Sequence, residues 1–335
     1  MSGMKTSTIK KLLSDRIETW LKSITDERVQ KLARDNTIIS GGAIASALAG
    51  DKINDYDIYF RNKETALAIA NHYCALFNSQ NGNKLSPNGT TCSPVVKEMQ
   101  IKNSKGNMED RVVIYMKSSG VASETQTEYK YFESRPEDET DEFVSSLANE
   151  ESVDAFDGAT EMETVASAVE KLAPSVNKAP YRPVFLSDNA ITLSGKIQLV
   201  IRFYGEPSQI HENYDYAHAM CYYTHWDHKL VCPPEALECI LSKTLVYKGS
   251  LYPIASIFRV RKFIERGWRI TAGQMLKIMF QISKLDLESP TVLRDQLLGV
   301  DQAYMHQLIR AIENKESTQR VDATYLAKLI DEIFE

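Results

Sequence analysis

The chain has 335 residues, 43% hydrophobic and 25% charged, which is typical of a globular protein and long enough for two or three domains. No run of about 18 apolar residues occurs, and the N-terminus has no apolar signal-peptide stretch, so we expect a cytoplasmic protein without a membrane partner. The five cysteines are odd in number and form no CxxC motif, which argues against a disulfide framework or a zinc site.

The net charge of −6 is unevenly distributed along the chain. The segment from Glu133 to Glu163 holds 12 acidic residues and one basic residue, so the rest of the chain is net positive by 5. A mildly basic body is compatible with a polyanionic substrate, although an ordinary mixed surface gives the same balance.

The first 117 residues alternate between helix and strand patterns. Amphipathic stretches within residues 7–35 predict two helices, with Thr25-Asp26 capping the second. The sequence NTIISGG predicts a strand that ends at a glycine turn, and the following AIASALAG predicts a helix that ends at Gly50. A strand in KINDYDIYFRN, a helix at 63–77, a loop at 78–94 and two strands near 95–103 and 110–118 complete this part.

The second half of the chain is divided by its composition. Residues 118–178 are rich in Ser, Glu and Thr and predict an acidic insertion that is mobile or locally helical. A hairpin around 189–195, a short helix in EPSQIHEN and a strand in YDYAHAMCYY follow. From residue 233 the pattern is helical, with helices predicted at 234–247, 253–266, 271–284, 290–298, 301–314 and 322–334.

These patterns predict an α+β fold in which a mixed sheet with flanking helices precedes an all-helical C-terminal domain. We assign residues 1–117 to the first part of the sheet domain and 118–178 to the insertion. Residues 179–232 return to the sheet, and 233–335 form the helical domain.

The segment from Ile38 to Phe60 carries the most specific chemical signal. Gly41-Gly42 lie at a predicted strand-to-helix turn, where glycine lets a phosphate approach the backbone and the helix N-terminus favours negative charge. After a spacer of twelve residues, Asp55 and Asp57 stand two apart on a predicted strand, so their side chains point the same way. Neighbouring carboxylates with hard oxygen donors favour Mg²⁺ or Mn²⁺.

This segment resembles the catalytic core of the polymerase-beta-type nucleotidyltransferases, which include poly(A) polymerases and CCA-adding enzymes. The matching residues are Ser40-Gly41-Gly42 and Asp55-Tyr56-Asp57-Ile58. The helix pattern YPIASIFRVRKFIERGWRIT also resembles phage and prophage members, which implies a host-cytoplasmic protein. The family usually has an aliphatic residue where Tyr56 stands, and the arginine-rich stretch of CCA-adding enzymes is not found, which disfavours tRNA repair.

The resemblance implies an enzyme that moves a nucleoside monophosphate from an NTP, with ATP first among the donors, to an acceptor hydroxyl. A nucleic-acid 3′ end is the expected acceptor. The family needs a third carboxylate on a later strand, for which Asp215 is our candidate and Asp227 and Glu212 are the alternatives. Catalysis and metal binding are thus assigned to Asp55, Asp57 and Asp215, and nucleotide binding to Ser40, Gly41, Gly42, Ser46 and Lys243.

Other charged residues have ordinary structural interpretations beside functional ones. Lys248, Arg259 and Lys262 can contact a triphosphate or lie on solvated helix faces. The histidines at 211, 218, 225 and 228 match no established zinc spacing, so a structural role is the default interpretation. Two other functions stay open: a catalytically silent binding or structural protein, and a toxin or anti-host factor that nucleotidylates tRNA or protein. The sequence does not determine the oligomeric state.

Overall fold

A computed structural model of the chain describes residues 3–81, 93–102, 108–117, 131–133, 181–187 and 189–287, with single positions at 292, 296 and 328. The chain divides into two compact units. The first comprises residues 1–212 and 219–236, and the second comprises 213–218 and 237–335. No helix within the described ranges is both long and apolar enough to cross a membrane.

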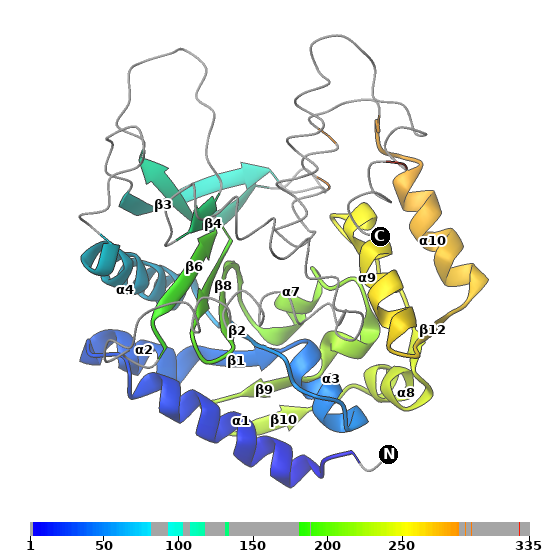
Figure 1. The fold of residues 1–335 in the computed structure, drawn as a ribbon, viewed down its shortest axis with the longest axis horizontal. Helices are drawn as coiled ribbons and strands as arrows, with labels where there is room; N and C mark the ends of the chain where they lie inside the picture. Colours follow the sequence, from blue (N-terminus) through cyan, green and yellow to red (C-terminus); the bar gives the residue numbers. More distant parts are fainter. Residues whose placement is uncertain are drawn as a thin grey trace. The chain divides into compact units, whose positions relative to one another are not determined.

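The first unit is built on an eight-stranded mixed sheet (Figure 1). Only the β2–β8 pair is parallel among the strand pairs described for this sheet. The strand order is β10 (Lys229–Val231), β9 (Tyr222–Thr224), β1 (Thr37–Ser40), β2 (Tyr56–Phe60), β8 (Ile197–Tyr204), β7 (Ala190–Leu193), β6 (Pro183–Ser187) and β5 (Tyr131–Glu133). Strands β3 (Ser93–Lys102) and β4 (Met108–Lys117) form a separate antiparallel pair. The predicted mixed sheet is thus confirmed.

Five α-helices accompany this sheet among the described residues: α1 (Thr6–Leu21), α2 (Glu27–Asn36), α3 (Gly42–Ala49), α4 (Lys63–Asn81) and α7 (Pro207–His211). The predicted cap of α2 is confirmed, because the Asp26 carboxylate accepts hydrogen bonds from the backbone N–H groups of Arg28 and Val29. The predicted end of α3 is confirmed as well, since Gly50 adopts the left-handed conformation with φ of 78°.

One face of the sheet is apolar because alternate residues of neighbouring strands lie in register. Tyr223, Ile39, Ile58, Leu199 and Ile191 form a continuous row across five strands, and each side chain is 0% exposed. Helices α1 and α4 pack against this face and are joined by a buried 2.8 Å hydrogen bond from Trp20 Nε1 to the Tyr73 hydroxyl. Buried Tyr56 lies on the same face under the Arg16 guanidinium of α1, 4.9 Å from its ring centroid.

The second unit contains α8 (Pro234–Ser242), which begins in the first unit, α9 (Pro253–Glu265) and α10 (Ala272–Ile282). Its core is aromatic: Tyr216, Tyr247, His218, Phe263 and Trp268 lie within ring-contact distances of one another. The all-helical expectation is wrong in one respect, because β11 (Thr244–Leu245) and β12 (Arg269–Ile270) form a short parallel pair. This pair ends α8 five residues before the predicted boundary at 247.

Two other predictions need correction. The strand expected over YDYAHAMCYY is instead a bend at Asp215, a 3-10 helix at Ala217–Met220 and the short strand β9. The hairpin expected around 189–195 is a three-stranded meander of β6, β7 and β8. Most of the acidic insertion and the helices predicted beyond residue 290 lie outside the described residues.

Candidate functional site

Polar residues form a row one step along the strands from the apolar row. Ser40 of β1 pairs with Tyr222 of β9, and Asp57 of β2 pairs with Gln198 of β8. Thr192 of β7 continues this row beside Gln198. Because paired residues project to the same side of a sheet, these side chains share the face opposite the buried isoleucines. The polar row therefore marks the candidate functional side of the sheet.

The turn after β1 is shaped by Gly41. Its backbone has φ of 99° and ψ of −150°, a combination open essentially to glycine alone. A Cβ at this position would lie 2.8 Å from Asp57 Oδ2, so the glycine and the carboxylate pack directly against each other. The Gly41 N–H donates to the carbonyl of Ala219 at 3.1 Å, which fixes the turn against the segment before β9.

Gly42 differs from its neighbour because it is exposed and opens helix α3. A Cβ there would meet no atom within 4 Å. Nothing in the fold therefore requires glycine at this position, whereas a ligand seated at the helix N-terminus would use the open space. Ser46 lies one turn further along α3 and is half-buried.

Asp55 and Asp57 are both half-buried, while Tyr56 between them and Ile58 after them are buried. The two aspartates thus alternate with buried residues, although Asp55 lies one residue before β2 begins. The tyrosine that departs from the family pattern is 4% exposed, so its ring fits the layer beneath the site.

His211 of α7 joins the site through Ser40. The Ser40 hydroxyl lies 2.9 Å from His211 Nε2 and donates at 3.0 Å to the carbonyl of Cys221. A hydroxyl has one proton to donate, and Ser40 gives it to the Cys221 carbonyl. The Ser40 oxygen therefore accepts a hydrogen bond from His211, whose neutral ring carries its N–H at Nε2. Burial lowers the pKa of His211 to about 4, which keeps its ring neutral at physiological pH. No local motif marks His211 as a partner of Ser40, because α7 follows β1 by more than 160 residues.

The strand beside Asp57 carries no carboxylate. Strand β8 has the sequence IQLVIRFY, and its register places half-buried Gln198 opposite Asp57. The register then shifts between Ile58 and Phe60, where β8 takes up extra residues. Such bulges reorient side chains near functional sites. The sequence offered no signal for Gln198, because its importance comes from pairing across the sheet.

Asp215 belongs to the second unit and lies outside any strand, which corrects its predicted setting. Its carboxylate forms a 2.5 Å ion pair with Arg259 of α9, and its side chain is 14% exposed. The backbone N–H of Lys248 donates to the Asp215 carbonyl at 2.7 Å. Lys243 follows the last residue of α8 with φ of 48°, and its carbonyl accepts from Arg269.

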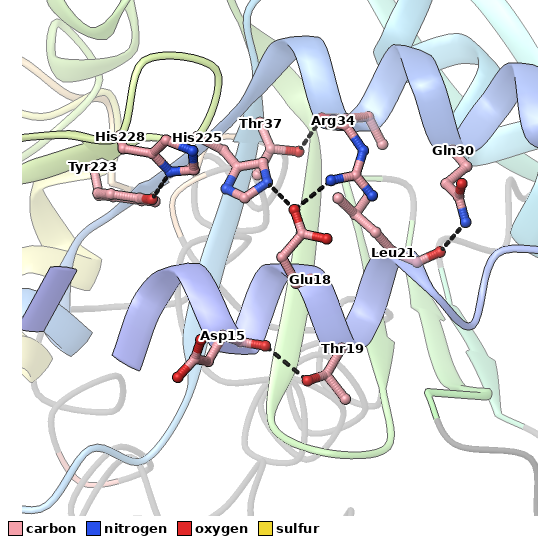
Figure 2. A network of polar contacts seen from close by, with 11 residues as sticks. Asp15, Glu18, Thr19, Leu21, Gln30, Arg34, Thr37, Tyr223, His225 and His228 are labelled. Carbon is pink, nitrogen blue, oxygen red and sulfur yellow. Dashed lines mark hydrogen bonds and ion pairs between the residues drawn. The ribbon is translucent and has the colours of Figure 1, made fainter. Parts of the chain in front are cut away.

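The four histidines that lie close in sequence have separate partners. His225 Nε2 contacts the Glu18 carboxylate at 2.9 Å, and Arg34 of α2 forms an ion pair with the same carboxylate (Figure 2). His228 Nδ1 lies 2.8 Å from the Tyr223 hydroxyl, and His218 belongs to the aromatic core of the second unit. The structural interpretation of the histidines at 218, 225 and 228 therefore agrees with their contacts, and the Glu18 network ties α1 and α2 to the end of β9.

No three His, Cys, Asp or Glu side chains gather closely enough to hold a metal ion in the parts of the chain that the structure describes. Asp57 of β2 and Asp55, immediately before the strand, therefore stand as a pair of carboxylates. Two half-buried aspartates, two residues apart, supply the hard oxygen donors that magnesium and manganese prefer.

The fold and site define an α+β protein with a mixed sheet, a glycine turn and a carboxylate pair on its polar side. Residues 11–243 match the model of the Gabija anti-defense 2 (Gad2) family, and the chain belongs to this family. Among curated proteins, none is similar enough in sequence to count as a relative.

One solved structure that resembles the chain is the Thermotoga maritima CCA-adding enzyme complexed with tRNA, at 11% identity and a TM-score of 0.33. The match covers 89% of this chain and 53% of that one, so the chain spans about half the length of the enzyme. A TM-score this low does not establish a shared fold.

Proposed function

We propose that the chain is a metal-dependent nucleotidyltransferase that moves a nucleoside monophosphate from an NTP to an acceptor hydroxyl and releases pyrophosphate. One observation supports this most directly: the Gly41 turn packs against Asp57 so closely that a Cβ would lie 2.8 Å from the carboxylate. A phosphate bound at the turn would therefore lie next to the carboxylate pair. ATP is the donor we expect, and the host cytoplasm is the expected location.

The residues of the first unit have distinct roles in this proposal. Gly42 leaves room for the phosphates at the α3 N-terminus, whose N–H groups favour negative charge. Ser40 stabilises the turn through its hydrogen bonds with His211 and the Cys221 carbonyl. Ser46 lies on α3, one turn beyond Gly42. Asp55 and Asp57 would hold Mg²⁺ or Mn²⁺. A bound divalent ion neutralises charge that develops on the phosphoryl oxygens.

The roles of Asp215 as third carboxylate and of Lys243 as triphosphate contact stay predictions from the sequence, and both residues belong to the second unit. Asp215 is 14% exposed, and its ion pair with Arg259 fixes the orientation of its carboxylate. A metal role for Asp215 requires that this ion pair opens or is shared with a ligand.

The acceptor is proposed on two grounds. The resemblance to template-extending and tail-adding enzymes supports a nucleic-acid 3′ end. The family description, Gabija anti-defense, supports a role against that defence, in which case the acceptor is a tRNA or protein of the host system. Both acceptors use the same chemistry, because each presents a hydroxyl to the α-phosphate.

A second candidate function is a catalytically silent binding protein. The observation that favours it is Gln198, which occupies the place opposite Asp57 where a further carboxylate would complete a metal site within the sheet. A protein that binds nucleotides without turnover would sequester them or act as a scaffold.

The test is label transfer from each α-labelled NTP, with Mg²⁺ or Mn²⁺, to a pool of RNA, single-stranded DNA and host protein. The Asp55→Asn/Asp57→Asn variant should lose transfer, while Asp35→Asn, which alters an exposed aspartate on α2, should retain it. Nucleotide binding without transfer would favour the silent protein. If no NTP shows either metal-dependent binding or label transfer, both candidate functions are refuted.

A further inference from the structure

Cys221 and Cys232 face each other at the end of the sheet. The last register pair between β9 and β10 is Tyr222 with Val231; Cys221 directly precedes β9 and Cys232 directly follows β10, so the two cysteines flank this pair on the same side. Directly opposed residues in an antiparallel pair have Cα atoms about 4.5–5.5 Å apart, within the range that a disulfide spans. Backbone placement therefore allows the two sulfur atoms to bond without moving either strand far.

The two thiols have different environments and contact each other. Cys221 is fully buried, whereas Cys232 is half-buried. A hydrogen bond between the two thiols lowers the pKa of Cys232 to about 7 and raises the pKa of Cys221. Buried Cys74 contrasts with Cys232, because burial raises the pKa of Cys74 to about 12.

The thiol pair is connected to the glycine turn through the backbone. The carbonyl of Cys221 accepts the Ser40 hydroxyl, and the carbonyl of Ala219 accepts the Gly41 N–H. A covalent link at Cys221 would therefore act on the segment that fixes this turn.

We propose that Cys221 and Cys232 form a redox-reactive dithiol that low-molecular-weight disulfides convert into an intramolecular disulfide. The Cys232 thiolate attacks one sulfur of the small disulfide and releases one small thiol, leaving a mixed disulfide on Cys232. The Cys221 thiol then loses its proton and attacks the Cys232 sulfur, which expels the second small thiol. Two protein thiols are oxidised, one small disulfide is reduced to two thiols, and their protons pass to the released thiolates.

The test uses full-length protein with Cys92→Ser, so that the remaining thiols are Cys74, Cys221, Cys232 and Cys239. Incubation with glutathione disulfide should remove two free thiols, and peptide mapping should find the Cys221–Cys232 disulfide, reversible by reductant. Because a disulfide restricts the unfolded chain, oxidation should also raise the melting temperature by several degrees.

Two variants make the inference decisive. Cys221→Ser should stop the reaction at a glutathione mixed disulfide on Cys232, while Cys74→Ser should oxidise like the parent. The rate of Cys232 alkylation should rise with pH through about 7. Absence of the mapped disulfide, or alkylation of Cys232 no faster than that of buried Cys239, would overturn the proposal. These measurements need no nucleotide, so their outcome is independent of the nucleotidyltransferase proposal.

Discussion

The two glycines of the turn should respond differently to alanine. A methyl group at Gly42 would meet no protein atom within 4 Å, and the residue opens helix α3 with ordinary backbone geometry. A methyl group at Gly41 would lie 2.8 Å from Asp57 Oδ2 on a backbone with φ of 99°. Gly42→Ala therefore probes the space where a ligand would sit, whereas Gly41→Ala probes the fold.

The magnitudes follow from the same geometry. Alanine replaces glycine at the start of a helix with a gain of about 0.4–1 kcal/mol in the free energy of unfolding, because it restricts the unfolded chain. Gly41→Ala should instead cost about 1–3 kcal/mol from the backbone conformation alone, before the contact with the carboxylate is added.

Melting temperature and metal-dependent binding of a fluorescent ATP analogue should be measured on both variants. We expect Gly42→Ala to melt at or above the parent temperature while nucleotide affinity falls at least tenfold, about 1.4 kcal/mol. Unchanged affinity in a stable Gly42→Ala protein would refute the placement of phosphate at this turn. Gly41→Ala should melt at a lower temperature, because alanine is strained in the backbone conformation of Gly41.

Three further predictions address packing, pH dependence and the third carboxylate. Tyr73→Phe removes the acceptor of the buried Trp20 N–H and should lower the free energy of unfolding by about 1–3 kcal/mol, measured by urea denaturation; no change would mean that the N–H finds another acceptor. Burial lowers the pKa of His225, so the stability that the neutral ring contributes is complete above pH 6.5 and is lost as pH falls through the lowered pKa. His225→Gln should therefore weaken the fall in melting temperature at acid pH. An unchanged fall would contradict this prediction. Asp215→Asn and Arg259→Gln should each lower the free energy of unfolding by about 1 kcal/mol, because the ion pair is partly exposed. Only Asp215→Asn should abolish label transfer. Equal activity of the two variants would assign Asp215 a structural role.

Local patterns predicted the part of the fold that local interactions determine. The β1–α3–β2 segment, the Asp26 cap and the alternation of Asp55 and Asp57 with buried residues follow from turn chemistry and strand periodicity. Each of these features depends on residues close together in the chain.

The parts that were missed depend on distant pairing. The parallel neighbour of β2 is β8, which places Gln198 beside Asp57, and no periodicity within IQLVIRFY reveals that neighbour. The contact of His211 with Ser40 has the same origin. Asp215 was expected in a strand because aromatic residues surround it, but Tyr216 instead packs into the aromatic core of the second unit.

The strand order also has a consequence for synthesis of the protein. Strands β1 and β2 are made early, yet their outer neighbours are β9 and β8, which leave the ribosome only after residue 197. Until then the antiparallel β1–β2 pair has two unpaired edges, and exposed edges promote association between chains. At about 5–20 residues per second, this exposure lasts roughly 7–30 s during translation. A nascent chain of this protein should therefore depend on chaperones until β8 and β9 are added.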